Sequence, residues 1–475
     1  MVKTIETDIC IIGAGSGGLS VAAGASQMGA RTVLLEKGKM GGDCLNYGCV
    51  PSKALIAAGH AAHVMRNGKK FGIEPQEPQV DFQGVHDHVH GVIGAIAPHD
   101  SVERFEGLGV TVIQEAGRFV GRNEIEAGDT RIKAKYVVIA TGSSAGVPPI
   151  PGLQDVPFMT NETVFDLTEQ PSHLIVVGGG PIGSELAQAH RRLGAKVTVL
   201  EMFSILGKDD PEVTAVVKRR MALEGIDLRE GISIKQVAKG GDGVSVEIET
   251  DGKTETISGS HLLIAAGRSP NLDGLDLETA GVEYSKTGIE VDARLRTSNK
   301  KVFAIGDVAG GYQFTHMAGY HAGIVIRNIL FKLPAKVNYR AVPWVTYTDP
   351  EIAHVGQSEA QAKETLGKDI RILRFAFNEN DRAQAEHETD GLIKVVTDKK
   401  GRVLGASIAG ARAGELLLPW VMAVDQQQKI GKFAGLIAPY PTLSEVSKRA
   451  AGSYYIPSLF SERTKKIVRF LMKWF

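Results

Sequence analysis

Cysteine is scarce in this chain. Three of the 475 residues are cysteine, too few for the disulfide framework of a small secreted protein. The first residues, MVKTIETDICIIGAGSGG, lack the basic segment, long apolar core and small-residue cleavage site of a signal peptide. No run of about 18 or more apolar residues occurs, so we expect no membrane-spanning helix. We therefore expect a cytoplasmic protein, and in that reducing setting a close cysteine pair is more often catalytic or metal-binding than structural.

An excess of charge of either sign is also absent. Lys and Arg together number 54, as do Asp and Glu, so no global field favours nucleic acid or a membrane. We expect no nucleic-acid partner. The chain is, however, long enough for about two to four domains. Its 56 glycines suit tight turns and close approaches of the backbone to ligands.

The N-terminal region carries a dinucleotide-binding pattern. An apolar strand over 7–12 leads into the turn glycines Gly13, Gly15 and Gly18, and an Ala-rich helix and a second strand ending at Glu36 follow. In this G-x-G-x-x-G pattern the glycines let the backbone approach a pyrophosphate, which lies at the positive end of the helix. Glu36 is placed to accept hydrogen bonds from a ribose. The strand, turn, helix, strand and acid together predict a dinucleotide site.

The same pattern recurs over residues 173–201. Its glycines are Gly178, Gly180 and Gly183, and its acid is Glu201. Two such units predict two dinucleotides with an electron route between them, although one unit could be only a structural copy. A carboxylate at Glu201 pairs with a free 2′-hydroxyl and repels a 2′-phosphate, so we expect NAD to be preferred over NADP.

Three further apolar strands end in small residues, at 136–144, 261–271 and 301–310. Asp307 follows Gly306 at the end of the third strand, where ligands bind in α/β sheets, and it suits a hydroxyl-rich ligand such as a ribityl chain. Asp307 could also serve as a helix N-cap for the segment that follows, and the two roles are compatible. The other cofactor-binding candidates near these strands are Gly117, Thr141, Gly142, Gly267, Arg268, Gln313, Phe314, Thr315 and His316.

Two of the three cysteines, Cys44 and Cys49, lie in GGDCLNYGCVPSK. With the two glycine fingerprints and AIGD around Asp307, this motif resembles the pyridine nucleotide–disulfide oxidoreductases of the two-cysteine flavoprotein class. That family includes dihydrolipoamide dehydrogenase, glutathione reductase and mercuric reductase. The resemblance spans nearly the whole chain, and it implies FAD at the first fingerprint, NAD(H) at the second and a homodimer formed through the C-terminal domain. A metal site is disfavoured, because no second cysteine or histidine pair has suitable spacing.

The resemblance also implies roles for single residues. Cys49 is the thiol nearest the flavin, where the following helix N-terminus would stabilise its thiolate, and Cys44 is the thiol that exchanges with substrate. Lys53 and Glu185 match the family's ion pair near the reactive nitrogen of the flavin, although an ordinary salt bridge is the alternative. Electrons are then expected to pass from NADH to FAD and on to a Cys44–Cys49 disulfide. Cys10, within a strand, is expected in the core.

One position departs from the pattern of the disulfide reductases. Their His-Pro-Thr-x-x-Glu motif reads Tyr440-Pro-Thr-Leu-Ser-Glu445 in this chain. A phenol, with a pKa near about 10 against about 6.5 for imidazole, is a poor general base at neutral pH. Mercuric reductases also carry tyrosine there, but they end in a Cys-Cys pair, and this chain has no cysteine after Cys49. The acceptor therefore stays open among a small disulfide, a metal ion and a quinone.

The expected fold class is α/β, with two Rossmann-like dinucleotide-binding domains and a C-terminal α+β dimerisation domain. A proline-bearing linker over 146–152 separates the first two domains. From Pro343 the pattern changes, and 392–408 reads as a β-hairpin. The expected boundaries are 1–148 for the first part of the FAD-binding domain, 149–268 for the NAD-binding domain, 269–341 for the rest of the FAD-binding or central part, and 342–475 for the dimerisation domain.

Two stretches fall outside this scheme. His86, His88 and His90 alternate and would share a face on a strand, whereas on a helix only His86 and His90 would; a solvated surface is favoured over a metal site. Residues 458–475 form a basic amphipathic pattern. It suggests peripheral contact with the inner face of a membrane, and the alternative is packing on the dimer interface. This tail also leaves open a membrane-docked, redox-sensing partner protein whose turnover is incidental.

Overall fold

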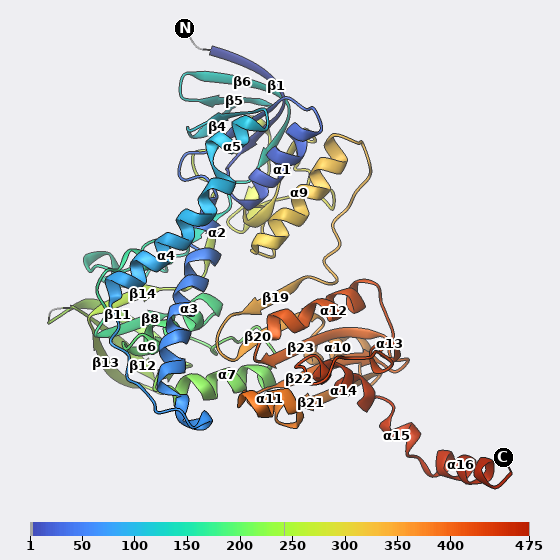
Figure 1. Ribbon diagram of the computed structural model, residues 1–475. Helices are drawn as coiled ribbons and strands as arrows, with labels where there is room; N and C mark the ends of the chain where they lie inside the picture. The colour runs from blue at the N-terminus through green and yellow to red at the C-terminus, as the bar shows by residue number, and fades with distance from the viewer. Residues whose placement is uncertain (1–2, 242, 475) are drawn as a thin grey trace.

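The computed structural model describes residues 3–241 and 243–474. Its body has three parts, with the N-terminal sheet at the top of Figure 1, the second sheet below it on the left and the C-terminal sheet on the right. The two sheets with parallel cores and the antiparallel C-terminal sheet confirm the predicted fold class.

The N-terminal sheet has seven strands in the order β3-β2-β1-β6-β5-β4, and β18 pairs with β6. The pairs β1–β2, β2–β3, β1–β6 and β6–β18 are parallel, whereas β4, β5 and β6 form an antiparallel edge. Helices α1 and α9 lie side by side on one face. The elements are β1 (Lys3–Ile12), α1 (Ser16–Gln27), β2 (Thr32–Leu35), α5 (Val102–Gly107), β3 (Val110–Ile113), β4 (Gly117–Gly121), β5 (Glu124–Ala127), β6 (Thr130–Ile139), α8 (Leu277–Ala280), β16 (Tyr284–Ser285), β17 (Gly288–Ile289), β18 (Val302–Ala304) and α9 (Thr315–Ile329).

Apolar side chains cover both faces of this sheet. Cys10 on β1 is fully buried in the cluster on one face, which confirms its predicted place in the core. Ile9 and Ile11, the neighbours of Cys10 on the strand, point to the cluster on the other face. The continuous apolar run of β1 is thus explained by burial on both sides, which is typical of a parallel sheet.

The second sheet repeats the core of the first. Its order β10-β9-β8-β14 is parallel throughout and matches β3-β2-β1-β6. A three-stranded antiparallel meander covers one face through a shared apolar cluster. The elements are β8 (His173–Val177), α6 (Pro181–Arg192), β9 (Lys196–Leu200), α7 (Pro211–Leu223), β10 (Asp227–Arg229), β11 (Ser233–Gly240), β12 (Gly243–Thr250), β13 (Lys253–Gly259) and β14 (His261–Ile264).

Two kinds of connection join these domains. Strands β7 (Ser143–Ala145) and β15 (Arg268–Pro270) pair antiparallel where the chain leaves the first domain and returns to it. The long helix α3 (Cys49–Arg66), preceded by α2 (Gly42–Asn46), runs from the first domain down to the second and packs on α6, with α4 (Phe82–Ile96) beside it (Figure 1). Helix α3 therefore carries residues near its N-terminus to the junction of the two domains.

Helix α4 decides between the two readings of the histidine stretch. His86 and His90 share a face of the helix, with ring centroids 4.1 Å apart. Within the described residues there is no group of three His, Cys, Asp or Glu side chains that could hold a metal ion.

The C-terminal sheet is antiparallel, in the order β19-β20-β23-β22-β21. Strands β22 and β23 pair as the predicted hairpin. The core between sheet and helices contains Trp420, which is fully buried and stacks on Phe433. The elements are β19 (Pro343–Thr346), β20 (Glu351–Gly356), α10 (Glu359–Leu366), β21 (Ile370–Ala376), α11 (Asp381–Glu386), β22 (Leu392–Asp398), β23 (Val403–Gly410), α12 (Ala413–Asp425), α13 (Gly431–Ala434) and α14 (Glu445–Ser453).

Buried ion pairs hold this domain against the second sheet. Lys394 on β22 is 4% exposed, and its ammonium lies 2.8 Å from Asp210 at the start of α7. The same ammonium lies 2.8 Å from Glu212 and 2.6 Å from Glu359. A buried lysine requires such partners, because an uncompensated charge in the interior is costly.

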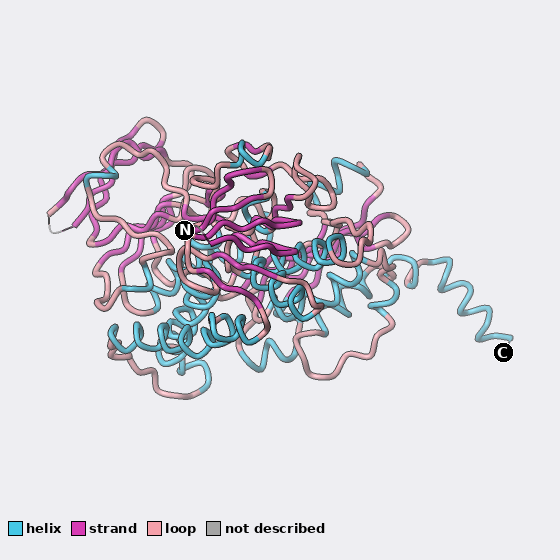
Figure 2. Tube along the Cα trace, turned by 90° about the horizontal axis from the view of Figure 1, so that it is seen from above, coloured by secondary structure: helices cyan, strands magenta, loops and turns pink. Residues whose placement is uncertain are grey.

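The chain ends in α15 (Ile456–Leu459) and α16 (Glu462–Trp474). Helix α16 projects away from the body (Figures 1 and 2). Over the described part of the chain, no helix combines the length and apolar character needed to cross a membrane.

Candidate active site

Both glycine fingerprints form the same tight turn. Gly13 has φ +106° and Gly178 has φ +107°, a conformation that other residues rarely adopt. A Cβ at Gly18 would overlap the carbonyl oxygen of Gly13, and a Cβ at Gly183 would overlap that of Gly178. The third glycine therefore brings each helix close against its preceding strand, and the N-termini of α1 and α6 point out of the carboxyl ends of their sheets.

The two acids hold these turns in place. Glu36 accepts hydrogen bonds from the N–H of Ala14 at 2.6 Å and that of Gly38 at 2.7 Å. Glu201 accepts equivalent bonds from Gly179 at 2.7 Å and Phe203 at 2.9 Å. A carboxylate has about four lone-pair sites, so each acid keeps acceptor capacity for a ribose hydroxyl.

A cavity of about 950 Å³ extends from the first fingerprint to the cysteines. Of the predicted site residues, those that line it are Gly13, Gly15, Glu36, Cys44, Cys49, Lys53, Gly117, Thr141, Gly142, Glu185, Arg268, Gly306, Asp307, Gln313, Phe314, Thr315 and His316. Gly18 and Gly267 are not among the lining residues, nor are the second-fingerprint residues Gly178, Gly180, Gly183 and Glu201. Pro181 and Ile182 of α6 do line it, so the cavity reaches the edge of the second fingerprint.

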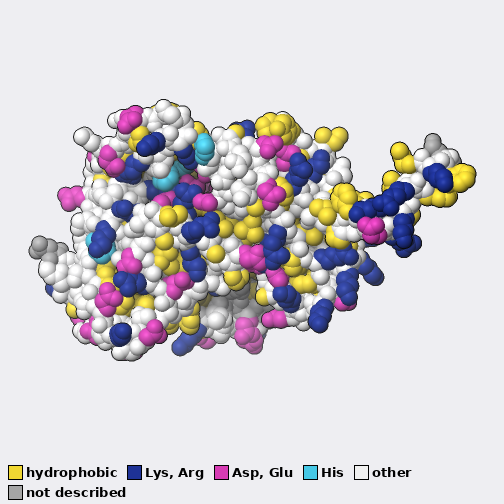
Figure 3. Space-filling model, turned by 90° about the horizontal axis from the view of Figure 1, so that it is seen from below, with side chains coloured by type: hydrophobic (Ala, Val, Ile, Leu, Met, Phe, Trp, Pro, Cys, Tyr) yellow, Lys and Arg dark blue, Asp and Glu magenta, His cyan; other side chains and the backbone are white. Residues whose placement is uncertain are grey.

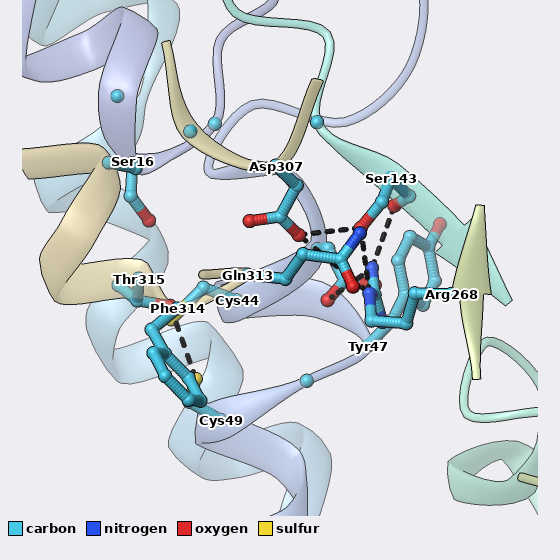
Figure 4. A pocket seen from close by; sticks show the side chains of 18 of the residues that line it. Ser16, Cys44, Tyr47, Cys49, Ser143, Arg268, Asp307, Gln313, Phe314 and Thr315 are labelled. Carbon is cyan, nitrogen blue, oxygen red and sulfur yellow. Dashed lines mark hydrogen bonds and ion pairs between the residues drawn. The ribbon is translucent and has the colours of Figure 1, made fainter. Parts of the chain in front are cut away.

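Asp307 lies mid-cavity, in a polar network (Figure 4). Its carboxylate accepts a hydrogen bond from the Ser143 hydroxyl at 2.5 Å. Arg268 donates from Nε to that hydroxyl at 2.7 Å, and its Nη2 lies 3.1 Å from Asp43. Burial raises the pKa of Asp307. The further role as a helix N-cap is wrong, because Ile305 and Phe314 hold the N-cap positions of the short turn at 306–309 and of α9.

The two cysteines come together at the far end of the cavity. Cys44 lies in α2 and Cys49 is the first residue of α3, and both are free thiols in the structure. A hydrogen bond from Cys44 is the main cause that lowers the pKa of Cys49 to about 6, helped by Thr315 and the charge of Lys53. The same hydrogen bond, with burial, raises the pKa of Cys44. At neutral pH the pair is therefore a Cys49 thiolate beside a Cys44 thiol.

Thr315, at the start of α9, supports the thiolate. Its hydroxyl oxygen lies 3.3 Å from Cys49 Sγ (Figure 4). Cys49 also begins a helix, whose N-terminal N–H groups favour negative charge. Both features agree with the expected stabilisation of a thiolate at this cysteine.

Lys53 and Glu185 form an ion pair that lines the cavity. The Lys53 ammonium lies 2.8 Å from Glu185 Oε2, and Glu185 is nearly buried. The other carboxylate oxygen accepts a hydrogen bond from the Tyr347 N–H at 2.9 Å, and the ammonium lies 4.1 Å from the centroid of the Tyr347 ring. Lys53 is one helical turn beyond Cys49 on α3, so helix geometry places the cation beside the sulfur.

Tyr440 lies away from this cavity in the described chain. Its side chain is 70% exposed, and its hydroxyl donates to Asp381 at 3.0 Å, which raises the pKa of Tyr440. Glu445 begins α14. Neither residue is among the described residues that line the cavity. Any contact of Tyr440 with the cysteines would have to come from a partner subunit, as the sequence resemblance implies.

Comparison with known families decides the class. The family model described as pyridine nucleotide-disulphide oxidoreductase matches residues 7–322, and that of its dimerisation domain matches residues 342–451. The chain belongs to this family.

Relatives of this oxidoreductase fall into two groups. The chain is 35% identical over 448 residues to a mercuric reductase from Bacillus cereus, and the aligned region covers 94% of the chain and 71% of that protein. It is 36% identical over 456 residues to a dihydrolipoyl dehydrogenase from Geobacillus stearothermophilus, which covers 94% of the chain and 96% of that protein.

Solved structures give the same assignment. LpdA from Mycobacterium tuberculosis superposes with a TM-score of 0.86 at 27% identity, covering 94% of this chain and 99% of that one. The Cu(II) complex of the HOCl-induced flavoprotein disulfide reductase RclA from Escherichia coli superposes with a TM-score of 0.83 at 27% identity. The superposition covers 93% of this chain and 98% of the RclA chain.

Membership confirms the predicted cofactors, FAD and a nicotinamide nucleotide. The first fingerprint and its cavity fit FAD: Gly15 and Glu36 suit its pyrophosphate and adenosine ribose, and Asp307 suits the ribityl hydroxyls. Cys44, Cys49 and Lys53 line the same cavity and would face the reactive end of the cofactor. The dimerisation-domain match supports the predicted homodimer.

The sequence alone did not single out several residues of this oxidoreductase's site. Asp43 lies within the cysteine motif and Ser143 within the stretch 136–144, but nothing in the sequence pairs them with Arg268 or Asp307. His321 is buried on α9, and its Nδ1 accepts a hydrogen bond from the Gly306 N–H at 3.2 Å. Burial lowers the pKa of His321 to about 4, so the neutral ring can act as that acceptor. This hydrogen bond holds the turn from which Asp307 faces the cavity.

Proposed function

We propose that this oxidoreductase transfers electrons from NADH through FAD to a Cys44–Cys49 disulfide and then to a small disulfide, as a dihydrolipoamide-dehydrogenase-like enzyme that can also run in reverse. The observation that carries the proposal is the asymmetric pair at the end of the cavity. The pKa of Cys49 is lowered to about 6, whereas that of Cys44 is raised.

This asymmetry fits disulfide reduction. Bound FAD supplies two-electron transfer between the nicotinamide and the disulfide. Two electrons and one proton added to the disulfide give one thiol and one thiolate. The Thr315 hydroxyl and the Lys53 charge favour the thiolate at Cys49, which leaves the proton on Cys44.

The acceptor step then requires the proton of Cys44 to leave. The Cys44 thiolate attacks one sulfur of the acceptor disulfide, forms a mixed disulfide and releases a thiolate that takes up a proton. Cys49 then attacks Cys44 Sγ, which restores the internal disulfide and releases the second thiolate. A residue that accepts the first proton and returns it to a leaving sulfur accelerates both steps.

Tyr440 makes that proton transfer the weak step. Its hydrogen bond to Asp381 raises an already high pKa, so the phenol donates a hydrogen bond but does not accept a proton at neutral pH. We therefore expect slow reduction of lipoamide by the native enzyme and faster reduction by Tyr440→His.

The test is NADH oxidation with lipoamide by the FAD-loaded enzyme. Tyr440→His is expected to raise the rate by about 10-fold or more, within the usual contribution of general acid–base catalysis. Tyr284→His, at another exposed tyrosine on β16, is the matched control and should leave the rate unchanged. No lipoamide reduction by either the native enzyme or Tyr440→His would refute the disulfide acceptor.

The second candidate is reduction of a soft metal ion. It is favoured by the thiolate–thiol pair, which suits soft metals, and by the likeness to mercuric reductases, whose tyrosine this chain shares. It predicts Hg(II)- or Cu(II)-dependent NADH oxidation that Cys44→Ser abolishes. If the metals leave NADH oxidation unchanged, this candidate fails and the first is untouched.

The preference for NADH is the third part of the proposal. Glu201 is followed by Met202 and Phe203, both exposed, where a 2′-phosphate would need a cation. Glu230 lies nearby, since it accepts a hydrogen bond from the Ile205 N–H at 2.7 Å, and it pairs with the ammonium of Lys218 at 3.1 Å. We expect kcat/KM to favour NADH over NADPH by at least about tenfold, which corresponds to about 1.4 kcal/mol. Equal values for the two nucleotides would refute this preference.

A further inference from the structure

The C-terminal helix α16 presents an apolar surface that the body does not cover. Ile467, Val468, Phe470, Leu471, Met472 and Trp474 are all between 47% and 81% exposed. Among the described residues of this helix, 462–474, none is buried. Figure 3 shows yellow and dark blue side chains together on the projecting tail. Monomeric proteins rarely leave such contiguous apolar surface in water, so a partner is implied.

The charges of α16 lie opposite this surface. At about 100° per residue, helix geometry groups the basic side chains after the first turn on one face and most of the apolar side chains on the other, whereas Arg463 falls on the apolar side at the start of the helix. The basic face carries Lys465, Lys466, Arg469 and Lys473. The apolar face carries Ile467, Val468, Phe470, Leu471 and Trp474. The helix thus has one water-facing cationic stripe and one broad apolar stripe.

The family's dimerisation-domain model does not include this helix. The dimerisation-domain match ends at residue 451, before α15 and α16 begin. Within that match, Val446 and Ala450 of α14 are buried in the C-terminal core. The tail therefore lies outside the part of the fold that the family model covers.

We propose that α16 lies in the surface of an anionic lipid bilayer, with its apolar face among the acyl chains and its basic stripe on the headgroups. The chain as a whole is neutral, with 54 residues of each charge sign, whereas α16 concentrates basic residues against the single acid Glu462. Local charge of this kind attracts anionic headgroups, and Trp474 and Phe470 suit the membrane–water interface. The helix has 13 residues, too few to span a bilayer, which takes about 20.

A second copy of the chain is the weaker occupant. Pairing two α16 helices through their apolar faces would bury those faces but would leave both basic stripes on the outside without a counter-charge. An anionic bilayer neutralises the positive charge of the basic stripe and buries the apolar face at the same time. The proposal goes beyond the redox reaction and is independent of which acceptor the cysteines serve.

The experiment is vesicle flotation of the FAD-loaded, full-length enzyme. It compares vesicles of equal parts phosphatidylglycerol and phosphatidylcholine with vesicles of phosphatidylcholine alone. The charge variant is Lys465→Glu/Lys466→Glu/Arg469→Glu, and the apolar variant is Phe470→Ser/Leu471→Ser/Trp474→Ser. The matched control is Lys196→Glu/Lys239→Glu/Lys368→Glu, which makes the same charge change at exposed lysines elsewhere on the surface. Ferricyanide reduction by NADH verifies that every variant is folded and holds its cofactor.

The native enzyme and the control should float with the anionic vesicles and not with the neutral ones. Each tail variant should bind at least about 10-fold more weakly, because one basic residue alone contributes about fivefold at such a surface. Equal flotation of the charge variant, or no flotation of the native enzyme, overturns the proposal. Sedimentation distinguishes the other occupant: tail variants that lower the oligomeric state without changing flotation would assign α16 to a contact between copies. None of these outcomes depends on turnover with lipoamide.

Discussion

The hydrogen bond between Thr315 and Cys49 leads to the sharpest prediction. Thr315→Val keeps the shape of the side chain and removes the hydroxyl that lies 3.3 Å from the sulfur. A hydrogen bond to a charged group contributes about 1.5–3 kcal/mol, and one pKa unit corresponds to about 1.4 kcal/mol. Because Cys49 is exposed to the cavity, solvent screens part of this effect. We expect the pKa of Cys49 to rise by about one unit.

The assay follows alkylation of Cys49 by iodoacetamide in the reduced enzyme as a function of pH, with the modified cysteine identified by mass spectrometry. The native midpoint should lie near the pKa of about 6, and the Thr315→Val midpoint should lie near about 7. Below the midpoint Cys49 is a thiol and reacts slowly; above it, the thiolate reacts. Thr256→Val, at an exposed strand position, is the matched control. An unchanged or lower midpoint in Thr315→Val, with FAD still bound, would refute the assigned hydrogen bond.

Three further predictions concern buried charge. Lys53→Met leaves the nearly buried carboxylate of Glu185 without its cation. We expect the free energy of unfolding in denaturant titration to fall by about 1–3 kcal/mol and the reduction of the cysteines by NADH to slow. Lys196→Met is the control and should change neither quantity. Lys394→Met removes an ammonium shared by three carboxylates and should lower the free energy of unfolding by about 3–5 kcal/mol; a loss below about 1 kcal/mol would contradict that role. Arg374 and Lys394 hold the pKa of Glu212 at about 2, below its ordinary 4.5, so its contribution to stability is complete above pH 4.5 and is lost as the pH falls toward 2. Acid unfolding curves should show that loss in the native enzyme, and Glu212→Gln should flatten it.

Local patterns made much of the fold predictable. The two fingerprints combine a strand, a glycine turn and a helix within about 30 residues, and each strand's burial on both faces shows as an apolar run. The hairpin of β22 and β23 is equally local. The cysteine pair was predictable because five positions of sequence already place one cysteine in the short helix α2 and the other at the start of α3, which follows it directly. The boundaries expected between the domains remain predictions.

The partners of the site residues were not predictable in this way. Asp307 meets Ser143, and Cys49 meets Thr315, only because strands and helices far apart in sequence end at the same cavity. Tyr440 shows the opposite case: its motif is plain in the sequence, yet within the described chain its hydroxyl contacts Asp381 and lies outside the cavity. Motif spacing identifies a residue type, whereas its partners depend on non-local packing.

The sequence by itself determined the class of chemistry: two dinucleotides, a cysteine pair and a tail with opposed basic and apolar faces. These follow from spacing along the chain, because turns, helix faces and strand burial are set by neighbours within a few residues. Only the tertiary structure decided the surroundings, and so the pKa values, of the groups that carry out that chemistry. The Thr315 contact of Cys49, the Ser143 and Arg268 partners of Asp307 and the paired Lys394 depend on groups contributed from distant elements, since pKa values respond to burial and to charges in space.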